Sequence, residues 1–211
     1  MAEFDQLQRQ QVLDWLHQQV PRSRVAHILR VEQLAIALAQ QHSLNAAQAA
    51  QSGLMHDLAK YFKPKILLEM ATAAGLPIDP VDQANPHLLH ARVSALVAQQ
   101  EFQVDDPAIL AAIADHTLGR AGMTPLSCVV FLADSLEPGR GDTAALNHLR
   151  QISQQNLMKA VWMTCDYTFR YLLDTHQLIH PTAVQTRNWF LQADTRQNLP
   201  LLDSSLPAGS L

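Results

Sequence analysis

The chain has 211 residues, of which 48% are hydrophobic and 16% charged, and its formal net charge is -4. This length suffices for one well-packed core, and no repeat or internal linker divides it. The negative charge argues against a general nucleic-acid binder, although a bound metal cation would still allow a protein of this charge to hold phosphates.

The N-terminus and the cysteines predict a location inside the cell. The start, Met1 to Gln6, lacks a basic region followed by an apolar one, and the longest apolar runs, such as Cys128 to Ala133, are too short to span a membrane. Cys128 and Cys165 show no CxxC spacing. We therefore expect a cytoplasmic protein without membrane contact, in which both cysteines are buried, reduced thiols.

Apolar residues recur at i, i+3, i+4 and i+7 and strand signals are scarce, so the sequence predicts an all-α fold. Pro21 and Gly75 mark two helix ends, whereas Asp106-Pro107 and Thr124-Pro125 place a capping oxygen before a proline at the first helical position. The expected helices are 4–20, 24–41, 45–59, 64–74, 87–101, 107–116, 125–136, 143–150, 153–175 and 181–192.

The pair His56-Asp57 is the most informative motif, because it offers an imidazole and a carboxylate within an apolar segment. Imidazole binds Zn, Fe, Mn or Co, and a carboxylate can bridge two cations. Ala49, Ala50 and Gly53 lie on the helix face that leads to this pair. Small residues on that face predict a close approach of neighbouring helices.

Four further polar residues interrupt apolar helix faces: His27, His90, His116 and Asp134. Burying one such group without a partner costs roughly 2 to 7 kcal/mol. Separate hydrogen-bonded core histidines are one solution, but a shared metal centre would satisfy all of these residues at once. We therefore expect a metal centre.

In this order the residues resemble the HD superfamily of metal-dependent phosphohydrolases. Within it, four segments resemble the YqeK-type symmetrical bis(5'-nucleosyl)-tetraphosphatases: His56 to Lys60, His116 to Leu126, Phe131 to Arg140 and Thr186 to Asn188. The resemblance runs from about His27 to Asn188. It implies an HD-domain helical bundle over residues 23–192, with an N-terminal helix (1–22) packed on it and a C-terminal tail (193–211).

The resemblance also implies the ligand set. His27, His56, Asp57 and Asp134 would hold one metal ion, while Asp57, His90 and His116 would face a second ion or the phosphate chain. One or two ions per site are compatible with this set. The resemblance favours iron, and imidazole and carboxylate ligands leave Mn, Co and Zn open. Catalysis is then expected to depend on Asp57, His90, His116 and Lys60.

Several residues near the ligands are candidates for substrate contacts. Lys60, Arg140 and Arg187 are expected to bind phosphate, and Thr117 and Ser135 to donate hydrogen bonds to phosphate oxygens. The ligand residues His27, His90, His116 and Asp134 would also face the substrate. Glu137 either pairs with Arg140 or orients a metal ligand. Solvated surface positions are expected for Lys63, Lys65, His17, His42, His148 and His176, and His87 lies one turn before the preferred His90.

The residues alone support a metal-dependent phosphohydrolase, and the resemblance implies symmetric cleavage of diadenosine tetraphosphate into two ADP. Another nucleotide phosphohydrolase of the superfamily is an alternative, although Leu58-Ala59-Lys60-Tyr61 stands where hydrolases of guanosine tetraphosphate carry an acidic pair. A diiron oxygenase and a non-catalytic nucleotide sensor are further alternatives. Serine nucleophilic catalysis is disfavoured because no GxSxG elbow occurs. A dinucleoside polyphosphate is the expected partner, and a homodimer is left open.

Overall fold

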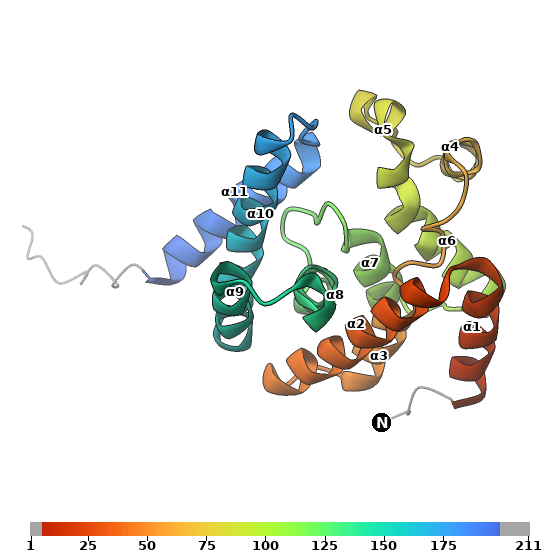
Figure 1. The fold of residues 1–211 in the computed structure, drawn as a ribbon, viewed down its shortest axis with the longest axis horizontal. Helices are drawn as coiled ribbons and strands as arrows, with labels where there is room; N and C mark the ends of the chain where they lie inside the picture. The colour runs from red at the N-terminus through yellow and green to blue at the C-terminus, as the bar shows by residue number, and fades with distance from the viewer. Residues whose placement is uncertain (1–5, 199–211) are drawn as a thin grey trace, which may run out of the picture.

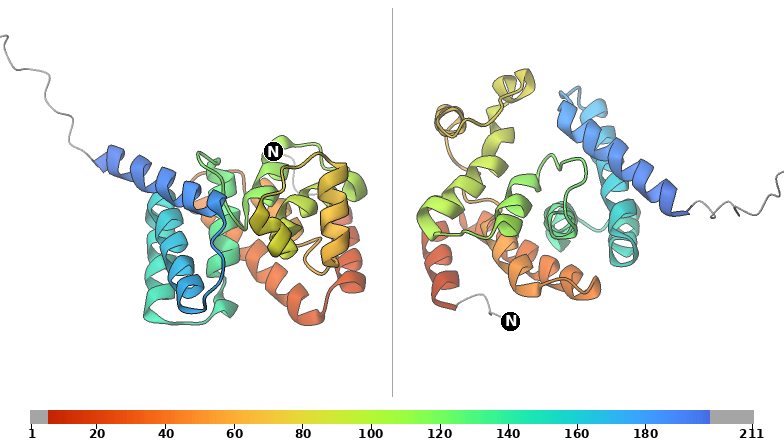
Figure 2. Two further views of the ribbon diagram at one scale, coloured as in Figure 1. Left: turned by 90° about the horizontal axis from the view of Figure 1, so that it is seen from above. Right: turned by 180° about the vertical axis from the view of Figure 1, so that it is seen from behind.

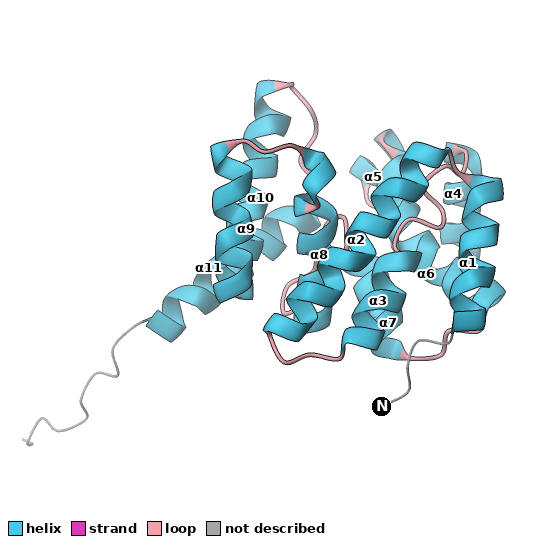
Figure 3. Cartoon of the chain, turned by 60° about the horizontal axis from the view of Figure 1, so that its bottom comes forward, coloured by secondary structure: helices cyan, strands magenta, loops and turns pink. Residues whose placement is uncertain are grey.

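A computed structural model describes residues 6–198, and within that range it contains helices and loops but no strand (Figure 3). The all-α prediction is therefore confirmed. The α-helices are α1 (Gln6–Gln19), α2 (Arg22–Gln41), α3 (Ala46–Met55), α4 (Pro64–Ala73), α5 (Pro80–Ala84), α6 (His90–Phe102), α7 (Pro107–Asp115), α8 (Pro125–Leu136), α9 (Ala144–Gln155), α10 (Leu157–Asp174) and α11 (Pro181–Asn198). Two short 3-10 helices, η1 (Pro86–Leu89) and η2 (Pro138–Arg140), precede α6 and follow α8.

Helix boundaries follow the local capping residues. As expected, Asp106 and Thr124 cap α7 and α8 with their side-chain oxygens, each before a proline. The expected break near residue 151 is wrong: α9 continues to Gln155, and the side chain of Asn156 accepts a hydrogen bond from the Lys159 N–H to start α10. The short helix α5, whose N-terminus is stabilised by a capping box, was not expected. The expected start at residue 4 and the tail lie outside the described residues.

Helices α2 and α3 pack closely through a small-residue face, as the sequence predicted. A Cβ atom added to Gly53 would lie 3.0 Å from the Cα atom of Glu32 and 3.3 Å from the Cβ atom of Ala35. Ala49 is fully buried at the same face. Any larger residue at position 53 would push α3 away from α2, and α3 ends at Met55, directly before the His56-Asp57 pair.

The buried apolar side chains form two clusters that meet at α2. Val31 and Ala35 of α2 belong to a cluster with side chains of α8, α10 and α11, whereas Val25 and Ile28 belong to a cluster with side chains of α1, α4 and α6. These two groups of helices lie on opposite sides of α2 (Figure 1). Both faces of α2 are therefore covered, and the polar residues that interrupt it must be satisfied inside the protein.

The C-terminal helix α11 lies beside α10 (Figure 2). Its Thr186 is fully buried and donates a hydrogen bond from Oγ1 to the Leu118 carbonyl at 3.0 Å. Gly119 has φ +66°, and Thr186 fills the space where its Cβ atom would stand. A residue with a side chain at position 119 would strain the backbone and clash, so the loop after α7 is fixed by α11.

Other expectations have mixed outcomes. Cys128 and Cys165 are buried free thiols, and burial raises the pKa of each to about 12. None of the helices in residues 6–198 has the length and apolar character needed to cross a membrane. The domain boundaries 1–22, 23–192 and 193–211 stay predictions.

Candidate metal centre

Four histidines and two aspartates from five helical segments converge between the two apolar clusters. His27 lies in α2, His56 and Asp57 follow α3, His90 begins α6, His116 follows α7 and Asp134 lies near the end of α8. All are buried except Asp134, whose side chain is 19% exposed. The structure thus brings together every ligand that the sequence predicted.

Three of the histidines are held in the same way. The Nδ1 atoms of His56, His90 and His116 lie 2.7, 2.5 and 2.7 Å from the backbone carbonyl oxygen three residues earlier. A carbonyl only accepts, so Nδ1 carries a proton in each ring, and Nε2 is the nitrogen that each ring offers to a cation. This arrangement is typical of metal-binding histidines, whose second nitrogen is fixed by a neighbouring acceptor.

A carboxylate takes the place of the carbonyl at His27. The Nδ1 atom of His27 lies 3.0 Å from Oε1 of Glu137, which is buried. Arg30 Nε and the Gly139 N–H both donate to Oε2 of the same carboxylate at 2.5 Å. The alternative that Glu137 orients a ligand is therefore the observed one, whereas its ion pair is with Arg30 and not with Arg140.

The carboxylate of Asp57 faces both halves of the site. Its Oδ2 atom lies 3.5 Å from Nε2 of His56 and 4.0 Å from Nε2 of His27. Its Oδ1 atom lies 3.2 Å from Nε2 of His90 and 3.6 Å from Nε2 of His116. A carboxylate with each oxygen turned to a different pair of histidines has the arrangement of a bridge between two cations.

Asp134 completes the half that contains His27 and His56. Its Oδ1 atom lies 3.1 Å from Nε2 of His27 and 3.8 Å from Nε2 of His56. The ligand atoms of these three residues lie within 4.8 Å of one another, as do those of His56, Asp57 and His116. Within residues 6–198, Nε2 of His27 and Nε2 of His56 have no hydrogen-bond partner, so both are available to a metal ion.

The protonation states also suit a cation. Burial works to raise the pKa of Asp57, but the neighbouring His56, His116 and His90 hold it well below its usual range. Burial also works to raise the pKa of Asp134, but His27, His56 and Arg140 together lower it. Burial lowers the pKa of His116 to about 4. At neutral pH the site therefore offers two ionised carboxylates and a neutral His116 imidazole.

Two of the expected substrate contacts lie at the His90 side. Lys60 Nζ and Thr117 Oγ1 are each 3.2 Å from Nε2 of His90. Burial lowers the pKa of Lys60 from its ordinary value. The Ala59 N–H donates to Oγ of the buried Ser94 at 2.9 Å, which fixes the turn between Asp57 and Lys60.

Arg140 and Ser135 lie at the Asp134 side. Arg140 Nη2 donates to Oδ1 of Asp134 at 2.5 Å, and its Nε donates to the Asp134 carbonyl at 2.8 Å. The Arg140 side chain is 40% exposed, so it stands at the solvent-exposed edge of the site. Ser135 follows Asp134 and is half-buried.

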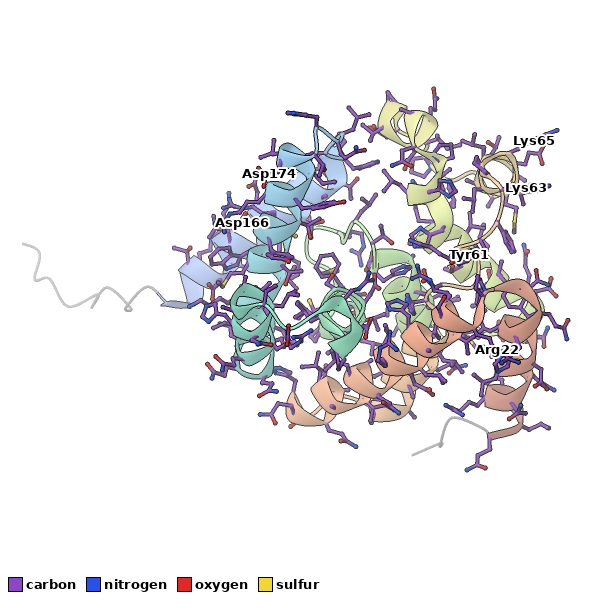
Figure 4. All side chains as sticks on the ribbon, in the orientation of Figure 1. Arg22, Tyr61, Lys63, Lys65, Asp166 and Asp174 are labelled. Atoms are coloured by element: carbon purple, nitrogen blue, oxygen red, sulfur yellow. The ribbon has the colours of Figure 1, made fainter. Side chains whose placement is uncertain are left out.

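Arg187 is placed differently from the other phosphate candidates. Its Nε atom donates to Oδ1 of Asp166 at 2.8 Å, so it links α11 to α10. Figure 4 labels Asp166 on α10, well away from Tyr61 beside Lys60. None of the contacts described for residues 6–198 joins Arg187 to a metal ligand, and its phosphate role stays a prediction.

The histidines and lysines that were expected at the surface match that prediction with one exception. His17, His148 and His176 are exposed, as is His87, which contributes its carbonyl to His90. Lys63 and Lys65 are exposed and point outward at the edge of the molecule (Figure 4). The expectation for His42 is wrong: it is half-buried, and its Nε2 lies 2.7 Å from the Ser153 carbonyl, because α9 packs beside the end of α2.

Sequence reasoning missed Arg24, which belongs to the site. Its Nη1 atom donates to Oδ2 of Asp57 at 3.0 Å. Arg24 and Arg30 stand three residues before and after His27, so all three share one face of α2. That spacing was the available signal for both arginines.

The geometry agrees with the comparison to known proteins. The HD domain model matches residues 24–139, which is more than half of the chain and includes all six candidate ligands. The chain belongs to the HD domain family. The expected superfamily is thus confirmed, and the segment after residue 139, which contains α9 to α11, extends beyond the matched domain.

Two curated relatives and one solved structure support a narrower family. The chain is 31% identical to the symmetrical bis(5'-nucleosyl)-tetraphosphatase of Bacillus subtilis over 88% of this chain and 98% of that protein. The enzyme of the same name from Staphylococcus aureus is 26% identical over 85% of this chain and 92% of its own. A crystal structure of a predicted HD superfamily hydrolase involved in NAD metabolism from Clostridium acetobutylicum superposes with a TM-score of 0.84 and 28% identity, covering 91% of this chain and 100% of that chain.

Proposed function

We propose that this protein is a metal-dependent hydrolase that cleaves diadenosine tetraphosphate symmetrically into two ADP. The observation that carries the proposal is the Asp57 carboxylate, whose two oxygens face different pairs of histidines in a chain related over most of its length to enzymes of that name. The complete ligand set favours an enzyme over a sensor, because every predicted ligand is present, buried or half-buried, and oriented inward.

The residues fit a metal ion. His27, His56, Asp57 and Asp134 are proposed to hold one ion, and Asp57, His90 and His116 a second ion or the phosphate chain. The two Nε2 atoms without partners and the two ionised carboxylates support this assignment. Iron is the favoured metal, with Mn, Co and Zn as further candidates. A bound ion would lower the pKa of water at the site and stabilise charge on phosphoryl oxygens.

The surrounding residues have distinct roles in this proposal. Arg140 and Lys60 stand on opposite sides of the ligands, next to Asp134 and His90, so that a chain of phosphates can be held between two cations. Thr117 and Ser135 would donate hydrogen bonds to phosphate oxygens. Arg24 holds Oδ2 of Asp57, which fixes the direction of the carboxylate. Arg187 would join the phosphate contacts only after its pair with Asp166 opens.

The symmetric outcome follows if these groups hold the phosphate chain at its middle. Positioning a reacting atom to within about 1 Å can change a rate about 100-fold, so the cleaved bond is set by where the chain is centred. The expectations of a cytoplasmic location, of no nucleic-acid or membrane partner and of a homodimer stay predictions.

One experiment tests substrate class and cleavage position together. The protein loaded with Fe, Mn, Co or Zn is incubated with dinucleoside tri-, tetra- and pentaphosphates and with guanosine tetraphosphate, and the products are separated by chromatography. The proposal expects ADP as the sole product from diadenosine tetraphosphate. ATP with AMP would contradict symmetric cleavage, and preferred hydrolysis of guanosine tetraphosphate would favour another activity of the superfamily. Oxygen-dependent turnover would instead favour an oxygenase.

A further inference from the structure

A pocket of about 250 Å³ adjoins the metal centre on the side of α10. Its lining includes Asp134, Ser135 and Arg140 from the end of α8 and the following turn, and Thr164, Tyr167 and Thr168 from α10. Because Asp134 is one of the candidate metal ligands, anything bound in the pocket lies next to the metal. Pockets for whole ligands are usually about 300 to 1,000 Å³, so this one has room for one end of a long molecule.

The hydroxyl of Thr164 is an unsatisfied polar group at this pocket. Thr164 is 1% exposed, and its Oγ1 atom has no hydrogen-bond partner within the described chain. The buried Thr186 on α11 shows the usual solution, since its Oγ1 bonds the Thr182 carbonyl one turn back and the Leu118 carbonyl. Buried hydroxyls without partners are uncommon, and a ligand atom would supply what Thr164 lacks.

The three pocket residues of α10 share one face of the helix. Tyr167 and Thr168 stand three and four residues after Thr164, which places an aromatic ring and two hydroxyls side by side. Tyr167 is 36% exposed, so part of its ring is open to a ligand. Nucleobases stack on aromatic side chains, and hydroxyls bond the polar edges of bases and sugars.

Charge divides the pocket into two ends. Arg140, at the Asp134 end, is the only cation among the lining residues, whereas the α10 side carries neutral hydroxyls and the tyrosine ring. The first end suits a phosphate, and the second suits a nucleoside attached to it. This order of groups matches one half of a dinucleoside polyphosphate.

We propose that Thr164, Tyr167 and Thr168 form the subsite for one nucleoside of the substrate, with the base stacked on Tyr167 and the hydroxyls bonded to ribose or base. The proposal rests on the proposed function for its substrate class. Through this subsite the chain positions the phosphates relative to Asp134, and so contributes to the choice of the cleaved bond.

The test measures binding of ADP and of inorganic pyrophosphate to the full, metal-loaded chain by calorimetry. Tyr167→Leu should weaken ADP roughly 10-fold, the effect expected for losing one stacked base, while Tyr167→Phe should stay within about 3-fold. Pyrophosphate binding should be unchanged in both variants. Tyr171→Leu is the matched control, because Tyr171 lies one turn further along α10, is 64% exposed and lines none of the described pockets.

A second variant tests the subsite without changing the Tyr167 ring. Thr164→Val preserves the shape of the side chain and removes the hydroxyl, so ADP should bind several-fold more weakly with unchanged thermal stability. Unchanged ADP affinity in both Tyr167→Leu and Thr164→Val would overturn the subsite, as would an equal loss of pyrophosphate binding. If the wild type fails to cleave diadenosine tetraphosphate but binds ADP in a Tyr167-dependent manner, the proposed function is wrong and the nucleoside subsite stands.

Discussion

Glu137 holds His27 from the side opposite the metal centre: its Oε1 atom lies 3.0 Å from Nδ1 of that ring. The carboxylate is fixed in turn by Arg30 and by the Gly139 N–H, both on Oε2. The orientation of a ligand on α2 is thereby set by a residue directly after α8, and the two helices must keep their relative position for the site to exist.

Glu137→Ala should lower the affinity for the metal about 10- to 100-fold, the usual effect of removing a residue that orients a ligand. The loss arises because the His27 ring is released and Arg30 loses its partner. A calorimetric titration of the metal-free protein with Mn²⁺ measures the affinity. Glu101→Ala, at an exposed position of α6, is the control. Equal affinity in the two variants would show that His27 is held by other contacts.

Glu137 should also make the stability of the metal-free protein depend on pH in the acid range. Burial works to raise the pKa of Glu137, but hydrogen bonds from Arg30 and His27 lower it from 4.5 to about 2. A lowered folded pKa stabilises the protein above the unfolded value, and this contribution is lost as the pH falls through about 2. The melting temperatures of the wild type and Glu137→Gln should therefore differ at pH 6 and converge near pH 2. A constant difference would contradict the assignment.

Asp57→Ala should lower turnover more than about 100-fold and remove most of the bound metal. The helical fold should remain. The carboxylate that faces both pairs of histidines has no substitute, and Arg24 loses its partner. Elemental analysis, product chromatography and circular dichroism measure the three properties. Full metal content with full activity would make Asp57 a structural residue.

Arg140→Ala should lower kcat/KM roughly 10- to 100-fold and leave metal content nearly unchanged, since the proposed partner of the guanidinium is phosphate. Its bond to Asp134 makes metal content the necessary control measurement. Arg140→Lys keeps the positive charge but cannot contact two phosphate oxygens at once, so its kcat/KM should lie between those of the wild type and Arg140→Ala. An unchanged kcat/KM would place Arg140 outside the substrate path.

Hydrolysis of diadenosine tetraphosphate in oxygen-18 water should label one of every two ADP molecules, on a terminal phosphate oxygen. Water then attacks one of the two central phosphorus atoms, where the phosphate chain is held between Arg140 and Lys60. Mass spectrometry of the nucleotides measures the label. Label in AMP or ATP would show that the substrate binds away from its centre.

The convergence of the candidate metal ligands was predictable because each one interrupts an otherwise apolar helix face, which leaves a periodic signal in the sequence. Helix starts were predictable where a proline follows a capping residue, as at Asp106 and Thr124. The break at Asn156 was not, because the apolar pattern continues across it and only the asparagine cap divides the helices. The place of His42 against α9 depends on tertiary packing, and so does the pocket face of Thr164 and Tyr167.

The hydrogen bond from Thr186 to the Leu118 carbonyl means that a fragment which keeps the loop after α7 in place must include α11. All six candidate ligands lie within residues 24–139. The loop that follows His116 is nevertheless held by α11, and Phe190 of that helix is buried in the same cluster as Val129. A fragment trimmed to residues 24–139 would retain each ligand and expose the apolar side of α8 to water. A fusion or transplant that is to preserve this packing must therefore carry the chain through α11.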